Sequence, residues 1–244
     1  MDIYRGQLEL LDYVFFTTVE RGKVYETGAF IHNYALAYAL RLAAAPYGHT
    51  VQEPHYEEEL SPLNQQGIYL TPAEPRSVGH RRVQFNTISE GYGFPGKAPS
   101  LGYPDWGFAR MLRPESVFQF YVILTGQEIS VSSPTLSLAL SGHPAYIRLG
   151  KFPGKARVTL QKAEFTEARH GEFVANALLN WRDLASVPEV PGDIYATALP
   201  TRLIANSHFH NTDYSYARFG EKDEVRLPLG MRFVAQSIRK KGKR

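Results

Sequence analysis

The pattern of hydrophobic and polar residues predicts alternating strands and helices in the first two thirds of the chain. Residues 3–11 alternate between polar and apolar side chains, which is typical of a half-buried strand. From Phe30 to Ala44 apolar residues recur every three or four positions, which predicts an amphipathic helix with its N-cap region at Thr27 and its end at Pro46. The apolar run 117–124 predicts a buried strand.

The same pattern continues after this strand. Ser133 and Pro134 are typical of the N-cap and first position of a second helix, with Gly142 just past its end. A strand at 145–149, a loop at 150–155 and an alternating strand at 156–165 follow. Beyond Gly171 the pattern is mixed, and it predicts a short helix near 174–184 with strands after it. The order strand, helix, strands, helix, strand favours an α+β, ferredoxin-like (RRM-like) fold.

The stretch 54–107 differs from the rest in being rich in Pro, Gly, Tyr and charge. It contains only short strand-like pieces at 67–71 and 82–88, and residues 91–107 hold five Gly and three Pro. Long irregular segments of this kind inside a domain are usually functional or mobile. Since no Gly/Ser-rich linker divides the chain, we expect a single domain over 1–238 with an insertion at about 50–116 and a basic tail at 239–244.

The composition excludes disulfide-linked proteins and metal sites built on cysteine. The 244 residues are 43% hydrophobic and contain no Cys, which excludes disulfides and thiolate metal sites. No apolar run approaches the roughly 18 residues of a membrane span, and no leader pattern is seen. We therefore expect a cytoplasmic protein without a membrane partner.

Charge is distributed unevenly along the chain. The net charge is +3, but five of the 27 basic residues lie in the last six positions, so the rest of the chain has 22 bases against 24 acids, or −2. The stretch from 129 to 163 has no acid and five bases, and Arg76, Arg81 and Arg82 lie together between Glu74 and Glu90. We therefore expect any anionic ligand to bind at these local basic stretches and not over the whole surface.

The pentapeptide Phe-Pro-Gly-Lys-Ala occurs twice, at 94–98 and 152–156. Its Gly lets backbone N–H groups approach an anion, its Lys adds charge and its Phe can stack on a base. A recurrent type II turn with Pro and Gly at its centre explains the repeat equally well. The second copy is the stronger candidate because it lies in the acid-free stretch. The segment 91–97, which overlaps the first copy, has P-loop spacing, but Ala98 and Pro99 follow it, which argues against a nucleoside triphosphate site.

Catalytic and metal motifs are sparse. His208 and His210 alternate, but a metal site needs further ligands, so we expect no metal and no cofactor. His32 lies beside Asn33 and Tyr34 in the predicted first helix. It is either a hydrogen-bonded helix residue, or a residue that contacts RNA or acts as an acid–base group. Glu57 and Glu58 are expected in a solvated polar loop.

Three strings carry a family resemblance. They are Phe30–Leu40 (FIHNYALAYAL), Tyr92–Trp106 (YGFPGKAPSLGYPDW) and Ile147–Ala156 (IRLGKFPGKA). Together they resemble the type I-D CRISPR-associated, Cas-five-like proteins of the RAMP superfamily, over most of the chain and more weakly after Gly171.

The resemblance implies an RRM-like RAMP domain with a Gly-rich loop and a thumb-like insertion. It implies a non-catalytic subunit of an RNA-guided surveillance (Cascade) complex in antiviral defence, which caps the 5′ handle of the guide RNA (crRNA). Its expected partners are that RNA, a Cas-seven-like backbone subunit, a large Cas-ten-like subunit and target double-stranded DNA near the PAM. The alternatives are a metal-independent endoribonuclease that processes the guide precursor, and an unrelated RRM-like RNA-binding protein.

Two sets of residues are the candidates for these contacts. For RNA they are Arg148, Gly150, Lys151, Phe152, Gly154, Lys155, Arg157, His32, Asn33, Arg81 and Arg82. For the thumb or a partner subunit they are Tyr92, Phe94, Lys97, Tyr103 and Trp106, whose aromatic rings we expect to become buried only on assembly.

Overall fold

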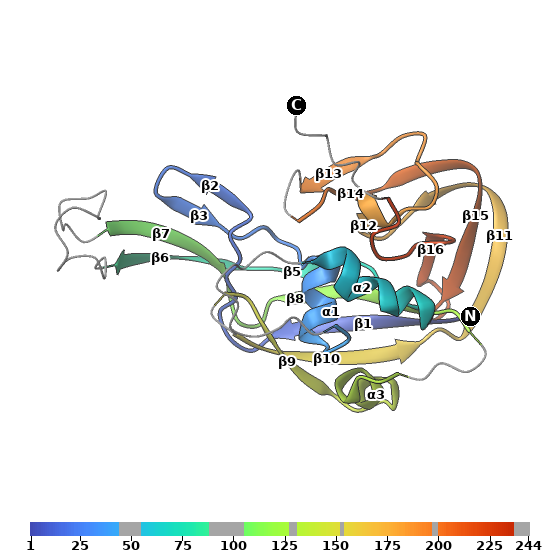
Figure 1. Ribbon diagram of the computed structural model, residues 1–244, viewed down its shortest axis with the longest axis horizontal. Helices are drawn as coiled ribbons and strands as arrows, with labels where there is room; N and C mark the ends of the chain where they lie inside the picture. The colour runs from blue at the N-terminus through green and yellow to red at the C-terminus, as the bar shows by residue number, and fades with distance from the viewer. Residues whose placement is uncertain (44–54, 88–104, 127–130, 152–153, 197–199, 237–244) are drawn as a thin grey trace.

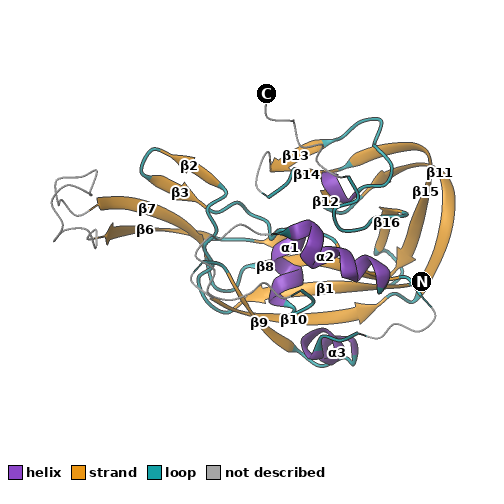
Figure 2. Ribbon diagram, in the orientation of Figure 1, coloured by secondary structure: helices purple, strands orange, loops and turns teal. Residues whose placement is uncertain are grey.

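The computed structural model describes residues 1–43, 55–87, 105–126, 131–151, 154–196 and 200–236. The helices are α1 (Asn33–Ala39), α2 (Tyr56–Gln65) and α3 (Pro134–Leu140), with one 3-10 turn at Trp181–Asp183. The remaining elements are strands, so the protein is a mixed α/β structure dominated by sheets (Figure 2).

A central antiparallel sheet forms the body of the protein. Its order is β4–β8–β1–β10–β9, and β5 also pairs with β8. These strands are β1 (Asp2–Leu10), β4 (Ile68–Leu70), β5 (Glu74–Ser77), β8 (Val117–Leu124), β9 (Ala145–Leu149) and β10 (Gly154–Lys162). Helix α1 contacts β4 and β9, α2 contacts β4, and α3 contacts β9 and β10.

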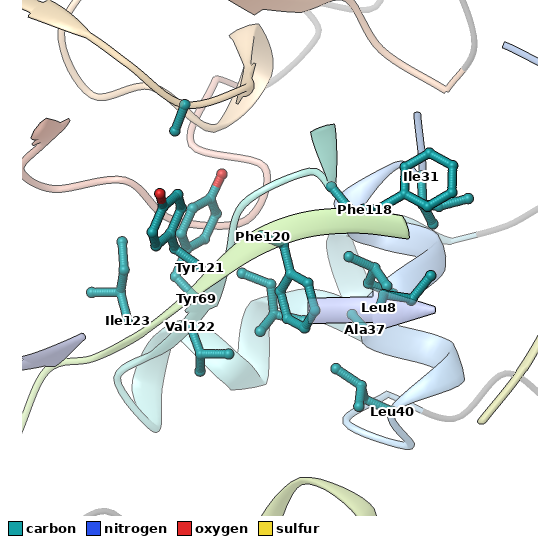
Figure 3. Close-up of a cluster of buried hydrophobic side chains, with 14 of the residues drawn as sticks. Leu8, Ile31, Ala37, Leu40, Tyr69, Phe118, Phe120, Tyr121, Val122 and Ile123 are labelled. Carbon is teal, nitrogen blue, oxygen red and sulfur yellow. The ribbon is translucent and has the colours of Figure 1, made fainter. Parts of the chain in front are cut away.

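The main core lies between this sheet and α1. Leu8 of β1 and Phe118 and Phe120 of β8 cluster with Ala37 of α1 and with Leu40, the residue after the helix (Figure 3), and all five are fully buried. Gly6 pairs with Phe120 across the two strands, and a Cβ at residue 6 would lie 2.4 Å from that ring. The position therefore needs glycine because the aromatic ring occupies the space of a side chain.

A second sheet forms an arm that extends away from the body (Figure 1). Its order is β2–β3–β7–β6, made of β2 (Val19–Arg21), β3 (Val24–Glu26), β6 (His80–Thr87) and β7 (Asp105–Leu112). The β6–β7 pair falls inside the expected insertion at about 50–116. In contrast α2, β4 and β5, which fall in the same range, belong to the body.

The C-terminal part packs at the other end of the molecule (Figure 1). It has two three-stranded sheets, ordered β11–β15–β16 and β12–β14–β13. The strands are β11 (Phe165–Ala175), β12 (Leu179–Asn180), β13 (Asp193–Ala196), β14 (Leu203–Ala205), β15 (Ser207–Arg218) and β16 (Glu224–Pro228). No helix in the described ranges is long and apolar enough to cross a membrane.

Several sequence expectations are confirmed. The first strand, the apolar strand 117–124 and the strand at 145–149 are present, and the Ser133 hydroxyl caps α3 by accepting a hydrogen bond from Leu136 N. The strand expected at 156–165 begins two residues earlier and ends at Lys162, and Phe165 opens the next strand.

Three expectations about helices are wrong. Residues 174–184 form strands and a 3-10 turn, because a short run of buried apolar residues does not distinguish strand from helix. Helix α1 spans only Asn33–Ala39, so it neither begins near Thr27 nor extends over the expected 30–44. Glu57 and Glu58 lie in the first turn of α2 and not in a loop, and acidic side chains are favourable at that end of a helix. The helix was not predicted because Pro62, which disfavours helix interiors, lies inside it.

Candidate nucleic-acid groove along helix α1

Helix α1 has a buried face and an outward face. Asn33, Tyr34, Leu36 and Ala37 are buried, whereas Ala35, Tyr38 and Ala39 are only partly covered. The helix starts at His32, whose Nδ1 accepts a hydrogen bond from the backbone N of Tyr34 at 3.2 Å. The two faces have different chemistry.

The buried face is tied to a fully buried carboxylate, Asp183. Five groups donate to its two oxygens: Asn33 Nδ2 at 2.6 Å, Tyr34 Oη at 2.7 Å, Val234 N at 2.9 Å, Asn180 Nδ2 at 3.0 Å and Tyr69 Oη at 3.1 Å. Burial nevertheless raises the pKa of Asp183 from 3.8 to about 6, because loss of hydration outweighs these donors. This network joins α1 to β4 and to the C-terminal part.

His32 belongs to the same interior network. Because its Nδ1 accepts a hydrogen bond, its Nε2 carries the proton and donates to Thr201 Oγ1 at 3.0 Å; Thr201 in turn donates to Asn180 Oδ1 at 2.6 Å. Burial lowers the pKa of His32 to about 3. His32 is therefore neutral at physiological pH, with both ring nitrogens engaged.

His32 and Asn33 were both expected to contact RNA. The structure places Asn33 at 0% exposure and His32 at 6%. Asn33 is an interior residue. His32 lines a hollow beside α1, but both of its ring nitrogens are engaged within the chain, so we propose neither residue as an RNA contact.

The outward face of α1 forms one side of a groove. Three hollows follow one another along it and share lining residues: Phe16, Ala35 and Tyr38 line the first two, and Tyr38, Ala39 and Arg148 line the last two. Their volumes are about 450, 300 and 400 Å³. The small side chains of Ala35 and Ala39 leave the floor of the groove open.

Cationic side chains also line this groove. Lys151 lies at the first hollow, Arg148 at the second and third, and Lys155 and Arg41 at the third. The Nζ of Lys155 lies 4.8 Å from the ring centroid of Tyr146, which is 55% exposed. Three of these cations come from the β9–β10 hairpin and its loop, the segment that the acid-free stretch had singled out.

The glycines of this loop are required by the chain itself. Gly150 has φ +89°, and a Cβ there would lie 3.0 Å from the carbonyl oxygen of Phe15; a Cβ on Gly154 would lie 2.6 Å from that of Tyr13. The backbone of Lys151 donates to Phe15 O at 2.9 Å. The loop is therefore held against residues 13–15, and its glycines serve this close packing.

The first hollow is mostly apolar and contains one carboxylate. Phe16, Phe30 and Tyr56 line it together with Tyr38 and Glu59. The Tyr38 hydroxyl donates to Glu59 Oε2. Burial, followed by the hydrogen bond and charge of Glu59, raises the pKa of Tyr38, so this phenol stays protonated as a donor.

The other predicted residues lie elsewhere. Arg157 forms an ion pair with Glu9 across β10 and β1. Arg81 and Arg82 lie on the arm, where Arg81 donates to Tyr13 Oη at 2.8 Å and Arg82 lies 5.9 Å from the ring centroid of Phe108. Tyr92, Phe94, Lys97, Tyr103 and Phe152 lie outside the described residues, as does the tail at 239–244. Trp106 is in β7.

Sequence reasoning missed Asp183, Asn180, Glu59 and Tyr56. Asp183 joins residues that are as much as 150 positions away in the chain, as its bond to Asn33 shows. Glu59 follows Glu57 and Glu58, which were expected in a solvated polar loop, and its contact with Tyr38 forms only because these residues belong to helix α2. No local signal in the sequence marks either residue.

A search against family models matches residues 1–236 to the type I-D CRISPR-associated protein Cas5/Csc1 family. No curated protein matches. Among solved structures, a chain of the type III-B Cmr-beta complex bound to cognate target RNA and AMPPnP has a TM-score of 0.45 at 10% identity, covering 84% of this chain and 86% of that one. A CRISPR protein from Archaeoglobus fulgidus has a TM-score of 0.41 at 11% identity, covering 93% of this chain and 100% of that one.

Proposed function

The chain belongs to the family of type I-D CRISPR-associated Cas5/Csc1 proteins, and we propose that it is an RNA-binding, non-catalytic subunit of a type I-D surveillance complex. In this proposal it caps the 5′ handle of the guide RNA. It contacts a Cas-seven-like backbone subunit and a large Cas-ten-like subunit, near the place where the PAM of target double-stranded DNA is inspected.

The groove along α1 is the observation that carries the proposal. It combines cations on one side, aromatic rings at one end and an open floor, which is the combination that single-stranded nucleic acid requires: charge for the phosphates and flat apolar surface for the bases. Lys151, Arg148 and Lys155 would contact phosphate or sugar, and Tyr146 and Phe16 offer surfaces for stacking. Phosphate contacts of this kind position the strand without reading its sequence.

The sheet order supports a ferredoxin-like assignment of the body. The order β10–β1–β8–β4, with α1 and α2 between β1 and β4 and α3 between β8 and the β9–β10 hairpin, corresponds to the strand order of that fold. The loop of the β9–β10 hairpin then takes the place of the Gly-rich loop of RAMP proteins.

The arm is the natural candidate for the thumb. The β6–β7 pair extends away from the body and carries Arg81, Arg82 and Arg110, and Arg110 is partly neutralised by Glu26 at 3.6 Å. We propose that this arm grips the guide RNA and a neighbouring subunit, while the groove holds the handle.

The state of His32 supports a role without catalysis. A general base for RNA cleavage must reach the 2′-hydroxyl and take its proton. His32 has one nitrogen on the α1 backbone and the other on Thr201, and its lowered pKa makes it a poor proton acceptor. We therefore propose that guide RNA is bound and not cut.

RNA binding is tested by replacing the groove lysines. The double variant Lys151→Ala/Lys155→Ala should bind a single-stranded handle RNA about tenfold or more weakly at 0.1 M salt. The slope of log affinity against log salt concentration should fall by up to about two, because two phosphate contacts are lost. The matched control is Lys162→Ala/Lys222→Ala, which removes the same charge from positions away from the groove and should lose much less. Equal loss in both double variants would refute the groove as the RNA site.

Cleavage is tested separately. Purified protein is incubated with a repeat RNA in EDTA, and the products are resolved on a sequencing gel. We expect intact RNA. Cleavage at one defined position, abolished in His32→Ala with the fold intact, would replace this proposal with the ribonuclease alternative.

A further inference from the structure

The cavity at the end of the groove has features that the phosphate contacts do not use. It measures about 450 Å³ and lies between the outward face of α1, helix α2 and the linker at residues 16–18. This is within the range of pockets that enclose small ligands. Lys151 lies on its wall, so it opens next to the cationic side of the groove.

The aromatic walls of the cavity are held in place. The ring of Tyr56 lies 4.9 Å from that of Tyr34 and 6.3 Å from that of Tyr38, measured between centroids. Tyr34 is itself fixed by its hydrogen bond to Asp183. The walls are therefore preorganised flat surfaces, and little is lost in ordering them when a planar group enters.

Glu59 provides a specific polar contact within these walls. One of its oxygens, Oε2, accepts the hydrogen bond from Tyr38. In the described part of the chain no hydrogen bond or ion pair engages the other oxygen, although Lys151 lines the same cavity. A carboxylate only accepts hydrogen bonds, so this oxygen selects a group that donates.

We propose that this cavity takes one unpaired base of the bound RNA and selects an amine-bearing edge through Glu59. Cytosine and adenine each present an exocyclic amine, and guanine presents an amine beside a ring N–H. Uracil presents a single N–H between two carbonyl oxygens, and these oxygens would face the carboxylate. The inference rests on the proposed function, since it assumes that RNA lies in the groove.

A side chain of a partner protein fits these features less well. An aliphatic or aromatic side chain would bury the Glu59 carboxylate without a donor, which is costly. An arginine could donate to it, but its charge would meet Lys151 on the same wall and the cations of the groove beyond. A polyanion with a neutral, amine-bearing base satisfies the carboxylate and the cations together.

The test uses the full chain and three fluorescein-labelled ten-nucleotide RNAs, oligo(A), oligo(C) and oligo(U), with affinities measured by anisotropy. We expect the wild-type chain to bind oligo(C) and oligo(A) about tenfold more tightly than oligo(U), the size of one good base contact. In Glu59→Gln the preference should disappear. The amide still accepts the Tyr38 hydrogen bond, and it also offers a donor to uracil.

The control is Glu57→Gln, an exposed position on the same helix that loses the same charge and should keep the preference. A preference that persists in Glu59→Gln, or a wild-type chain that binds the three RNAs equally, overturns the base cavity while RNA binding stands. Failure of every RNA to bind refutes the proposed function itself. If Glu59→Gln leaves RNA binding unchanged but loses a protein subunit from the assembled complex, the cavity holds a protein side chain instead.

Discussion

The two faces of α1 differ in what their side chains do: one is tied into the interior by hydrogen bonds, and the other borders an open groove. On the inward face Asn33 and Tyr34 donate to Asp183, and no buried side-chain nitrogen or oxygen in the described ranges is without a partner. On the outward face Ala35 and Ala39 are small and the surrounding cations line an open groove. The polar groups of the inward face are satisfied by the chain itself, whereas the outward face borders the groove that we propose as the RNA site.

The same contrast exists within the β9–β10 loop. Its glycines are explained by the close approach of residues 13–15, so they need no ligand to account for them. The side chains of its lysines line the groove, and Lys155 also lies over the ring of Tyr146. A Gly-Lys motif can thus combine a glycine with a structural reason and a lysine that lines an open groove, and only the structure separates the two roles.

The largest expected effect comes from breaking the inward face. Asp183→Ala removes the acceptor of five buried donors, and leaving such groups unpaired should cost about 3–5 kcal/mol of unfolding free energy. For a chain of this size that corresponds to a fall in Tm of roughly 10 °C. Thermal denaturation followed by circular dichroism measures it.

The control for this change is Asp193→Ala, an exposed aspartate that accepts one hydrogen bond from Asn206 at 2.8 Å. It should change the unfolding free energy by about 0.5 kcal/mol or less. Similar Tm values for the two variants would mean that the Asp183 network does not hold the two parts of the chain together.

A smaller effect should appear in the pH dependence of stability. The folded-state pKa of His32, about 3, is below its unfolded value of 6.5, so its contribution to stability is complete above pH 6.5 and is lost as the pH falls toward 3. Asp183 acts in the opposite direction. Its folded pKa of about 6 exceeds 3.8, so its contribution increases as the pH falls from 6 to 4.

Replacing His32 isolates one of these two opposing contributions. His32→Asn keeps a helix-capping acceptor and removes the titrating ring. Between pH 7 and 5 the variant should gain about 2 kcal/mol of stability relative to the wild type, from the 1.4 kcal/mol of each pKa unit. Urea denaturation at the two pH values measures the difference, and the exposed His208→Asn should show no such gain. Parallel pH profiles for His32→Asn and the wild type would place the acid sensitivity elsewhere.

The elements with strong local patterns could be predicted from the sequence. Strand 117–124 is a continuous apolar run, and Ser133 followed by Pro134 marks the start of α3, so both were located to the residue. Helix α2 was missed because Pro62 and its three glutamates imitate a loop. The β11–β15 pair could not be foreseen, because its register is set by partners about 30 to 50 residues apart.

The candidate site follows the same division, since the residues with a local signal in the sequence were predicted and those that depend on distant contacts were not. Lys151 and Lys155 were found from the absence of nearby acids, which is a local property. Glu59 and Asp183 depend on contacts between distant segments, so their roles appear only when the chain is folded. For His32 the sequence left open a hydrogen-bonded helix residue, an RNA contact and an acid–base group, and the structure shows it hydrogen-bonded at the start of α1 through both ring nitrogens.

The smallest expected effect on stability comes from filling the outward face, where the effect falls on RNA binding instead. Ala35 lines the first two hollows, and Ala35→Leu would place three more carbon atoms in the groove without touching the Asp183 network. A single-stranded RNA should then bind about tenfold more weakly, equivalent to ~1.4 kcal/mol, because the floor no longer allows close approach. The unfolding free energy should change by less than about 1 kcal/mol, since residue 35 is only partly buried.

Ala168→Leu, at an exposed position on β11, provides the control and should alter neither quantity. RNA affinity that is unchanged in Ala35→Leu, with the fold intact, would show that the outward face of α1 is not where RNA lies.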